Sequence, residues 1–312
     1  MSTRRQFIGQ SSAALAGASL LSAGSSWMSL AHAAAAGGTM LKRTIPSSGE
    51  AVPAIGMGTS GSFEITQGGP EYQALKEVLK RFFDGGATLI DTAPTYSNAE
   101  DVLGPLLADA KLRPKAFIAS KLSGVVGREQ GLAQFQKTLK SLRTDKVELL
   151  QVHNLGDWKT QFALAKELKQ QGKVKYTGIT HYLDSAHDAL ADVVQQTKPD
   201  FLQINYSVTN RGAEKRLFPM ARDLGVAVLA NRNFNDGRLF NQVKGKELPG
   251  WAAEAGVASW AQMFLKFALS DEAVTAVIPA TGKPERQSDN LKAGLGPLLT
   301  AAQKKEVIDL VG

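Results

Sequence analysis

A regular alternation of apolar and amphipathic segments is the feature that most constrains the fold of this 312-residue chain. Short apolar runs predict eight strands, at 54–58, 87–91, 116–121, 147–153, 175–180, 201–206, 226–230 and 273–279. Apolar residues at helical spacing lie between them, in segments that include 72–84, 128–142, 160–171, 185–196, 214–224 and 253–269. Eight strands that each precede a helix, within roughly 270 residues, predict an α/β fold, the (β/α)8 TIM barrel.

An open, doubly wound parallel sheet is the main alternative to the barrel. Such a sheet would be expected to carry a glycine-rich turn between its first strand and first helix. The glycines there do not have GxGxxG spacing; they are Gly56, Gly58, Gly61, Gly68 and Gly69. Segment 41–52, with Gly49 at its centre, is predicted to be an N-terminal β-hairpin that closes the barrel floor. Since no linker or composition shift interrupts 41–312, this range is predicted to be one domain.

The first 33 residues resemble an export signal rather than part of the barrel. The segment TRRQFI (3–8) has twin arginines followed by apolar residues, and Ala31-His32-Ala33 has the small-x-small spacing of a cleavage site. Serines dilute the weakly apolar run 13–30 below what a membrane-spanning helix needs. We therefore expect a cleaved twin-arginine signal peptide over 1–33, the Tat translocase as export partner, a periplasmic location and no stable membrane span after cleavage. The alternative is a cytoplasmic protein that keeps its N-terminus.

Composition excludes several classes of protein. The 36 basic and 29 acidic residues give a net charge of +7, and loss of Arg4 and Arg5 with the signal would leave +5. No basic cluster interleaved with aromatic residues follows, so no nucleic-acid binding is expected. The chain has no cysteine, which excludes disulfides, thiolate metal sites and thiol nucleophiles. HExxH, GxSxG and P-loop motifs are absent as well, and no metal site is predicted.

Ionisable residues occur where predicted strands end, which is where barrels of this type carry their chemistry. Asp91, Lys121 and His153 each end one of three successive strands, and Tyr96 follows Asp91 by five residues. Reduction of a carbonyl by hydride transfer builds negative charge on oxygen, which must then be protonated. A tyrosine has a pKa of about 10, and a nearby ammonium lowers it by favouring the phenolate. Asp91 can keep Lys121 charged beside Tyr96, and His153 can orient a carbonyl.

These residues lie in motifs that resemble the aldo-keto reductase family. DTAPTYSNAEDVLG (91–104) resembles the segment with the family's catalytic Asp and Tyr, FIASKL (117–122) the strand with its Lys, and LLQVHN (149–154) the strand with its His. The resemblance extends from about residue 43 to 290. It implies that Tyr96 is the general acid/base, that Lys121 and Asp91 tune it, and that His153 orients a small carbonyl or alcohol substrate.

The same resemblance implies a nicotinamide cofactor that lies across the barrel mouth without a Rossmann domain. Gln203 matches the residue that holds the carboxamide, and VIPATGKPERQSDN (277–290) resembles the motif at the adenine end. There Thr281 and Arg286, helped by Lys283, would hold a 2′-phosphate, so NADP(H) is expected rather than NAD(H). The cofactor-binding positions expected are Gly58, Thr59, His181, Gln203, Asn231, Arg232, Thr281, Lys283, Arg286, Asp289 and Asn290.

Some positions depart from the family pattern. His181, after Thr180, replaces the usual Asn, Asn231 replaces an aromatic that would stack on the nicotinamide, and Ala280 replaces a lysine. Arg232 could then bind the pyrophosphate. The aromatic residues expected around the mouth are Phe63, Trp158, Phe234, Phe240 and Trp251.

Two functions remain open at this stage. The first is an NADP(H)-dependent oxidoreductase that interconverts a carbonyl and an alcohol, loaded with cofactor before export. The alternative is a cofactor-binding redox sensor, or a binding protein of low turnover, on the same barrel. Two features favour the sensor: Asn231 cannot stack on the nicotinamide, and an exported enzyme would have no free supply of cofactor. The presence of all four catalytic residues, Asp91, Tyr96, Lys121 and His153, favours the enzyme.

Overall fold

The structure is a computed structural model that describes residues 38–312. The predicted signal peptide at 1–33 lies outside the described residues. Eight parallel strands form one sheet in the order in which they occur along the chain. They are β3 (Met57–Gly58), β4 (Leu89–Asp91), β5 (Phe117–Leu122), β6 (Val147–His153), β7 (Val174–Thr180), β8 (Phe201–Asn205), β9 (Ala227–Asn231) and β10 (Val274–Val277).

Backbone hydrogen bonds between the first and last strands close this sheet into a barrel. Gly56 N–H donates to the Val277 carbonyl (2.8 Å) and Gly58 N–H to the Pro279 carbonyl (3.1 Å). A Cβ at position 58 would lie 3.0 Å from the Ile278 carbonyl oxygen, so a glycine permits this approach. The predicted (β/α)8 barrel is thus confirmed.

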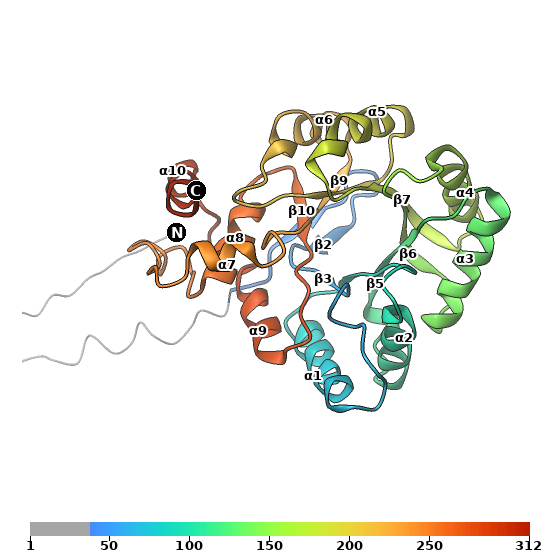
Figure 1. The fold of residues 1–312 in the computed structure, drawn as a ribbon, viewed down its shortest axis with the longest axis horizontal. Helices are drawn as coiled ribbons and strands as arrows, with labels where there is room; N and C mark the ends of the chain where they lie inside the picture. Colours follow the sequence, from blue (N-terminus) through green and yellow to red (C-terminus); the bar gives the residue numbers. More distant parts are fainter. Residues whose placement is uncertain (1–37) are drawn as a thin grey trace, which may run out of the picture. The chain divides into compact units, whose positions relative to one another are not determined.

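Helices surround the barrel (Figure 1). They are α1 (Pro70–Asp84), α2 (Ala99–Asp109), α3 (Arg128–Ser141), α4 (Trp158–Gln170), α5 (His187–Thr197), α6 (Leu217–Leu224), α7 (Arg238–Gln242), α8 (Trp260–Leu269), α9 (Pro284–Lys292) and α10 (Ala301–Val311). Short 3-10 turns occur at η1 (Arg113–Lys115), η2 (Asp184–Ala186) and η3 (Gly212–Glu214). None of the helices in the described range is long and apolar enough to cross a membrane.

Both the boundaries and the set of helices differ from the prediction. The helix predicted over 253–269 begins only at Trp260, because the Ser259 side chain accepts the Gln262 N–H and caps the helix there. Helix α2 was not among the predicted segments. Its interior holds Gly104 and Pro105, which are poor helix formers and weaken the sequence signal.

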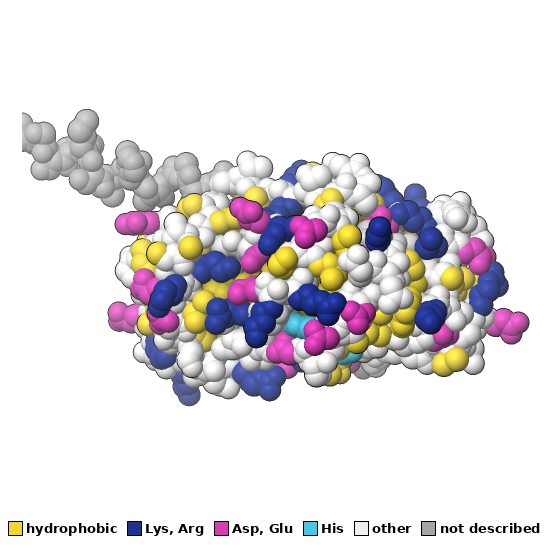
Figure 2. Space-filling model, turned by 90° about the horizontal axis from the view of Figure 1, so that it is seen from above, with side chains coloured by type: hydrophobic (Ala, Val, Ile, Leu, Met, Phe, Trp, Pro, Cys, Tyr) yellow, Lys and Arg dark blue, Asp and Glu magenta, His cyan; other side chains and the backbone are white. Residues whose placement is uncertain are grey.

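The N-terminal hairpin consists of β1 (Lys42–Thr44) and β2 (Ala51–Pro53), which pair antiparallel. Its Ile45 and Val52 are buried in the same apolar cluster as Phe117 and Phe201, near the starts of barrel strands. The hairpin therefore closes the floor as predicted, and the opposite end, where the strands finish, is left for the functional site. Figure 2 shows cationic and anionic side chains interspersed over one face of the molecule.

Candidate active site

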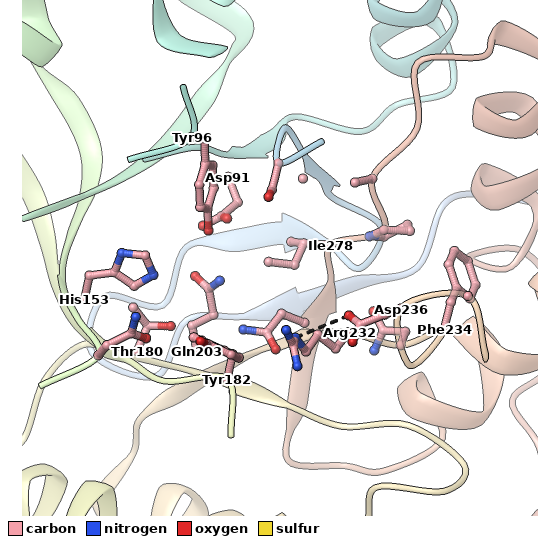
Figure 3. A pocket seen from close by; sticks show the side chains of 18 of the residues that line it. Asp91, Tyr96, His153, Thr180, Tyr182, Gln203, Arg232, Phe234, Asp236 and Ile278 are labelled. Atoms are coloured by element: carbon pink, nitrogen blue, oxygen red, sulfur yellow. Dashed lines mark ion pairs between the residues drawn. The ribbon is translucent and has the colours of Figure 1, made fainter. Parts of the chain in front are cut away.

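A cavity of about 600 Å³ lies where the barrel strands end. The predicted site residues that line it are Gly58, Asp91, Tyr96, His153, Gln203, Asn231, Arg232 and Arg286. Figure 3 shows the side chains of Tyr96, His153 and Gln203 directed toward the same open space from a loop and two strands. The fold thus brings together residues that are more than a hundred positions apart in the sequence.

Asp91 and Lys121 form a buried ion pair at the base of this cavity. The Lys121 ammonium donates to both Asp91 carboxylate oxygens, at 2.8 and 2.9 Å, and to the Thr92 carbonyl at 2.7 Å. Adjacent parallel strands β4 and β5 hold the two side chains side by side. Burial acts to lower the pKa of Lys121, but the Asp91 carboxylate outweighs burial and raises that pKa above its ordinary value. Lys121 therefore carries a fixed positive charge.

Tyr96 lies on the loop between β4 and α2, above Lys121. Its N–H donates to the Ala93 carbonyl (3.0 Å), and its ring centroid lies 4.8 Å from the Lys121 ammonium. Burial raises the pKa of Tyr96 above 10, and the attraction to Lys121 only partly offsets that rise. Lys121 thus acts to lower the tyrosine pKa as expected, but burial outweighs it and the net shift is upward. The phenol stays protonated at neutral pH, which is the state that a proton donor needs.

His153 ends β6 and faces Tyr96. The two rings meet edge to face, with centroids 6.1 Å apart, and His153 Nδ1 lies 2.7 Å from the Ser123 hydroxyl. Burial and the positive charge of Lys121 lower the pKa of His153 to about 3, so the ring is neutral at physiological pH. Ser123, which follows Lys121 by two residues, was not predicted as part of the site.

Two glutamine side chains continue this polar cluster inside the barrel. Gln151 Nε2 donates to Gln203 Oε1 at 2.7 Å and to Asp91 Oδ1 at 3.4 Å. Gln203 lines the cavity as predicted, whereas Gln151 lies beneath it and is fully buried. Gln151 lies within the motif LLQVHN (149–154), whose predicted functional residue is His153 alone.

Two predicted cofactor residues, Thr59 and His181, line neither this cavity nor the adjoining ones. The Thr59 hydroxyl is fully buried and donates to the Asp91 carbonyl at 3.1 Å, so it fixes the end of β4. His181 Nδ1 accepts the N–H groups of Tyr182 (3.0 Å) and Leu183 (3.2 Å) and thereby folds back on its own loop. Their neighbours Gly58 and Thr180 line the cavity instead.

The end of β9 contributes two polar residues and an aromatic contact. The Asn231 side-chain oxygen is buried and has no hydrogen-bond partner among the described residues. The Arg232 guanidinium stacks 4.3 Å from the centre of the Tyr182 ring and forms an ion pair with Asp236 (3.4 Å). Tyr182 therefore brings an aromatic ring to the cavity from the loop after β7, although position 231 does not carry the family's usual aromatic residue.

A second cavity, of about 510 Å³, shares Arg286 with the first. Thr281, Asp289 and Asn290 also line it, and Lys283 lies with Arg286 on an adjacent groove. Within the described range, Arg286 and Lys283 form no ion pair. The Asp289 carboxylate accepts from Ser259 Oγ and Gln262 Nε2, both at 2.6 Å, so it also anchors the start of α8.

The aromatic residues expected at the mouth divide into two groups. Phe234 and Phe240 line both cavities. Phe63 is fully buried in the core, Trp251 packs against the core while donating to Glu306, and Trp158 lies at the start of α4. Trp260, which was not predicted, forms part of the second cavity. Across the part of the chain that the structure describes, no three His, Asp or Glu side chains gather as a metal site would require.

Sequence comparison identifies relatives of this chain among known proteins. The chain is 27% identical to the methylglyoxal reductase YeaE of Escherichia coli over 245 residues, which cover 76% of this chain and 84% of that protein. It is 26% identical to the aldo-keto reductase YhdN of Bacillus subtilis over 189 residues, covering 56% of each. The chain thus spans little more than half the length of several curated relatives that it matches.

Solved structures share the fold. An aldo/keto reductase from Klebsiella pneumoniae, solved in complex with NADP and acetate, superposes with a TM-score of 0.73 at 24% identity. That alignment covers 88% of this chain and 95% of the other. The sequence model of the aldo/keto reductase family matches residues 54–308, which include every strand of the barrel. The chain therefore belongs to the aldo/keto reductase family.

Proposed function

We propose that this protein is an NADP(H)-dependent oxidoreductase that interconverts a small aldehyde or ketone and the corresponding alcohol. The buried Lys121–Asp91 pair carries the proposal, because it lies directly beneath a protonated tyrosine at the mouth of the barrel. A neutral histidine faces that tyrosine, and nothing else in the cluster is needed to move a proton onto a carbonyl oxygen.

The residues around the cavity fit a nicotinamide nucleotide. Such a cofactor supplies or accepts a hydride when it is bound. Gln203 and the unpartnered oxygen of Asn231 offer hydrogen-bonding groups for a carboxamide, and Arg286 and Lys283 offer charge for a phosphate. The NADP bound to the Klebsiella relative supports NADP(H) over NAD(H).

The residues of this chain then have separate roles in carbonyl reduction. In the tautomer in which the Ser123 hydroxyl donates to Nδ1, the neutral His153 ring carries its proton on Nε2 and orients the carbonyl oxygen. The Tyr96 hydroxyl gives its proton to that oxygen as negative charge develops there. Lys121 stabilises the resulting phenolate, and Asp91 holds Lys121 in place and charged.

Two measurements test the proposal. Titration of the protein from Ala34 onward, first freed of bound nucleotide, should show NADPH binding by quenching of tryptophan fluorescence, clearly tighter than NADH binding. Arg286→Ala should weaken NADPH binding and leave NADH binding nearly unchanged. Failure of the empty, folded protein to bind either nucleotide would refute the proposed cofactor.

Tyr96→Phe distinguishes an enzyme from a redox sensor. The variant lacks the proton donor, so we expect turnover to fall at least about a hundred-fold while NADPH still binds. Methylglyoxal is the first substrate to screen, because it is the substrate named for the relative YeaE. A sensor would instead keep its ligand response in the Tyr96→Phe variant.

We also propose that residues 1–33 direct export by the twin-arginine route and place the protein in the periplasm. The twin arginines Arg4 and Arg5, the serine-rich apolar run and Ala31-His32-Ala33 support this proposal. Replacement of both arginines by lysine should retain the uncleaved protein in the cytoplasmic fraction. Unchanged cleavage and fractionation of that variant would contradict the twin-arginine route.

A further inference from the structure

The hydrogen-bonded groups beneath the cavity include two glutamines, Gln151 and Gln203, in addition to the predicted catalytic residues Asp91 and Lys121. We infer that Gln151 is a positioning residue, which together with Asp91 fixes the Gln203 amide so that its NH₂ group faces the nicotinamide end of the cavity. The inference rests on the proposed cofactor and deepens it. It assigns a purpose to a fully buried polar side chain that touches neither cavity.

The hydrogen-bond pattern sets the direction of each amide. Burial raises the pKa of Asp91, whereas Lys121, which donates to both oxygens, and the amides of Gln203 and Gln151 favour the ionised carboxylate. The ionised carboxylate accepts hydrogen bonds and cannot donate them. Gln151 must therefore turn its NH₂ group toward Asp91, because its oxygen would otherwise face a carboxylate. The same NH₂ group donates its other hydrogen to Gln203 Oε1 at 2.7 Å.

The orientation of Gln203 follows from this contact. Its oxygen is occupied by Gln151, and its NH₂ group also donates toward the Asp91 carboxylate, so the second hydrogen of that NH₂ group is left to face the cavity that Gln203 lines. Asp91 and Gln151 together thus fix this donor at the cavity surface. Asn231, on the neighbouring strand β9, contributes a buried oxygen without a partner among the described residues. A donor and an acceptor on adjacent strands match a primary carboxamide, which carries one oxygen and one NH₂ group.

The packing around Gln151 indicates that the barrel accommodates this side chain at some cost. Its own Oε1 has no hydrogen-bond partner within the described structure, although it is buried. An unpaired buried oxygen is unfavourable, and a methionine or leucine here would avoid it. The neighbouring strand also carries Gly178 in register with Gln151, where a Cβ would lie only 2.8 Å from Gln151 Cγ. Both features are explained if Gln151 is needed for its NH₂ group.

The test compares two nucleotides that differ at the nicotinamide end. Gln151→Met keeps the size of the side chain and removes its donors, so Gln203 loses the contact that holds its oxygen and keeps only the contact with Asp91. We expect NADPH binding to weaken about three- to ten-fold, which corresponds to one hydrogen bond. Binding of 2′-phospho-ADP-ribose, which has no nicotinamide, should stay unchanged. Gln161→Met is the matched control, since Gln161 is an equally buried glutamine with an unpartnered oxygen that lines neither cavity.

A double-mutant cycle separates positioning from general damage. Gln203→Met alone should weaken NADPH binding, and Gln151→Met should add nothing in that background. Equal weakening of both nucleotides, unchanged NADPH binding, or additive effects of the two substitutions would each overturn the inference. Gln151→Leu replaces the methionine variant if thermal melting shows that the latter is not folded. A wild-type protein that binds 2′-phospho-ADP-ribose and NADPH equally well retains the nucleotide site but overturns the carboxamide contact.

Discussion

Single residues in this site are tuned by what surrounds them, and their identities alone do not fix their charge. Tyr96 and Lys121 illustrate the point. An ammonium next to a phenol predicts a lowered tyrosine pKa, yet burial of the Tyr96 ring reverses the net direction. Lys121, although fully buried, keeps its charge because Asp91 is in direct contact with it. The sequence shows which groups are present, and their depth below the surface decides which effect is larger.

At this scale, His153 leads to a prediction about pH. Burial lowers its pKa to about 3, against 6.5 for an exposed histidine. Between those values the unfolded chain binds more protons, so the stability linked to His153 is complete above pH 6.5 and is lost as the pH falls toward 3. We expect the unfolding free energy of His153→Gln to depend less on pH than that of the wild type. Between pH 7.5 and 5, the wild type should lose up to about 2 kcal/mol more unfolding free energy than the variant.

Chemical denaturation at the two pH values measures this difference. Other titrating groups contribute to both proteins and cancel in the comparison. Parallel pH profiles for the wild type and His153→Gln would show that the ring is not buried as described.

At the scale of elements, one residue at the start of α8 both caps that helix and holds a side chain of the second cavity. Ser259 caps the helix, and its hydroxyl also donates to Asp289, which lines that cavity. We expect Ser259→Ala to lower the unfolding free energy by about 1 kcal/mol, the usual effect of a lost N-cap. It should also weaken NADPH binding, because Asp289 loses one of its two anchors.

Thr300→Ala provides the matched control for that prediction. Thr300 caps α10 through a capping box, and it lines neither cavity. Its loss should lower the unfolding free energy by a similar amount, about 1 kcal/mol, without changing nucleotide affinity. If both variants leave NADPH binding unchanged, Asp289 does not depend on Ser259 for its position.

At the scale of the whole molecule, the barrel separates stability from chemistry by placing them at opposite ends. Ile45 from the N-terminal hairpin is fully buried with Phe117 and Phe201 at the floor. Ile45→Ala removes apolar volume there, so we expect a loss of about 2–4 kcal/mol in unfolding free energy. NADPH affinity and turnover should stay close to the wild type.

Val126→Ala serves as the control for the floor substitution. Val126 is 70% exposed on the loop after β5, so its truncation should change the unfolding free energy by less than about 0.5 kcal/mol. Equal effects of the two substitutions in denaturant titrations would mean that the hairpin does not close the barrel core.

The sequence by itself determined the alternation of strands and helices. The spacing of apolar residues is a local property of the chain, and it shows which segments can bury a strand or a helix face in a barrel. It also determined the positions of Asp91, Lys121 and His153 at strand ends, since parallel strands in a closed barrel finish on one face. Tyr96 was identified through its spacing from Asp91, within a motif that resembles the family's.

Contacts between distant segments decided the rest. Ser123 and Gln151 are part of the polar cluster, Tyr182 brings an aromatic ring from the loop after β7, and the Thr59 side chain does not line the cavity. Each of these outcomes depends on which side chain of a neighbouring strand lies within hydrogen-bond or stacking distance. Sequence spacing cannot specify that distance, because it is set by strand register, burial and loop conformation across the closed barrel.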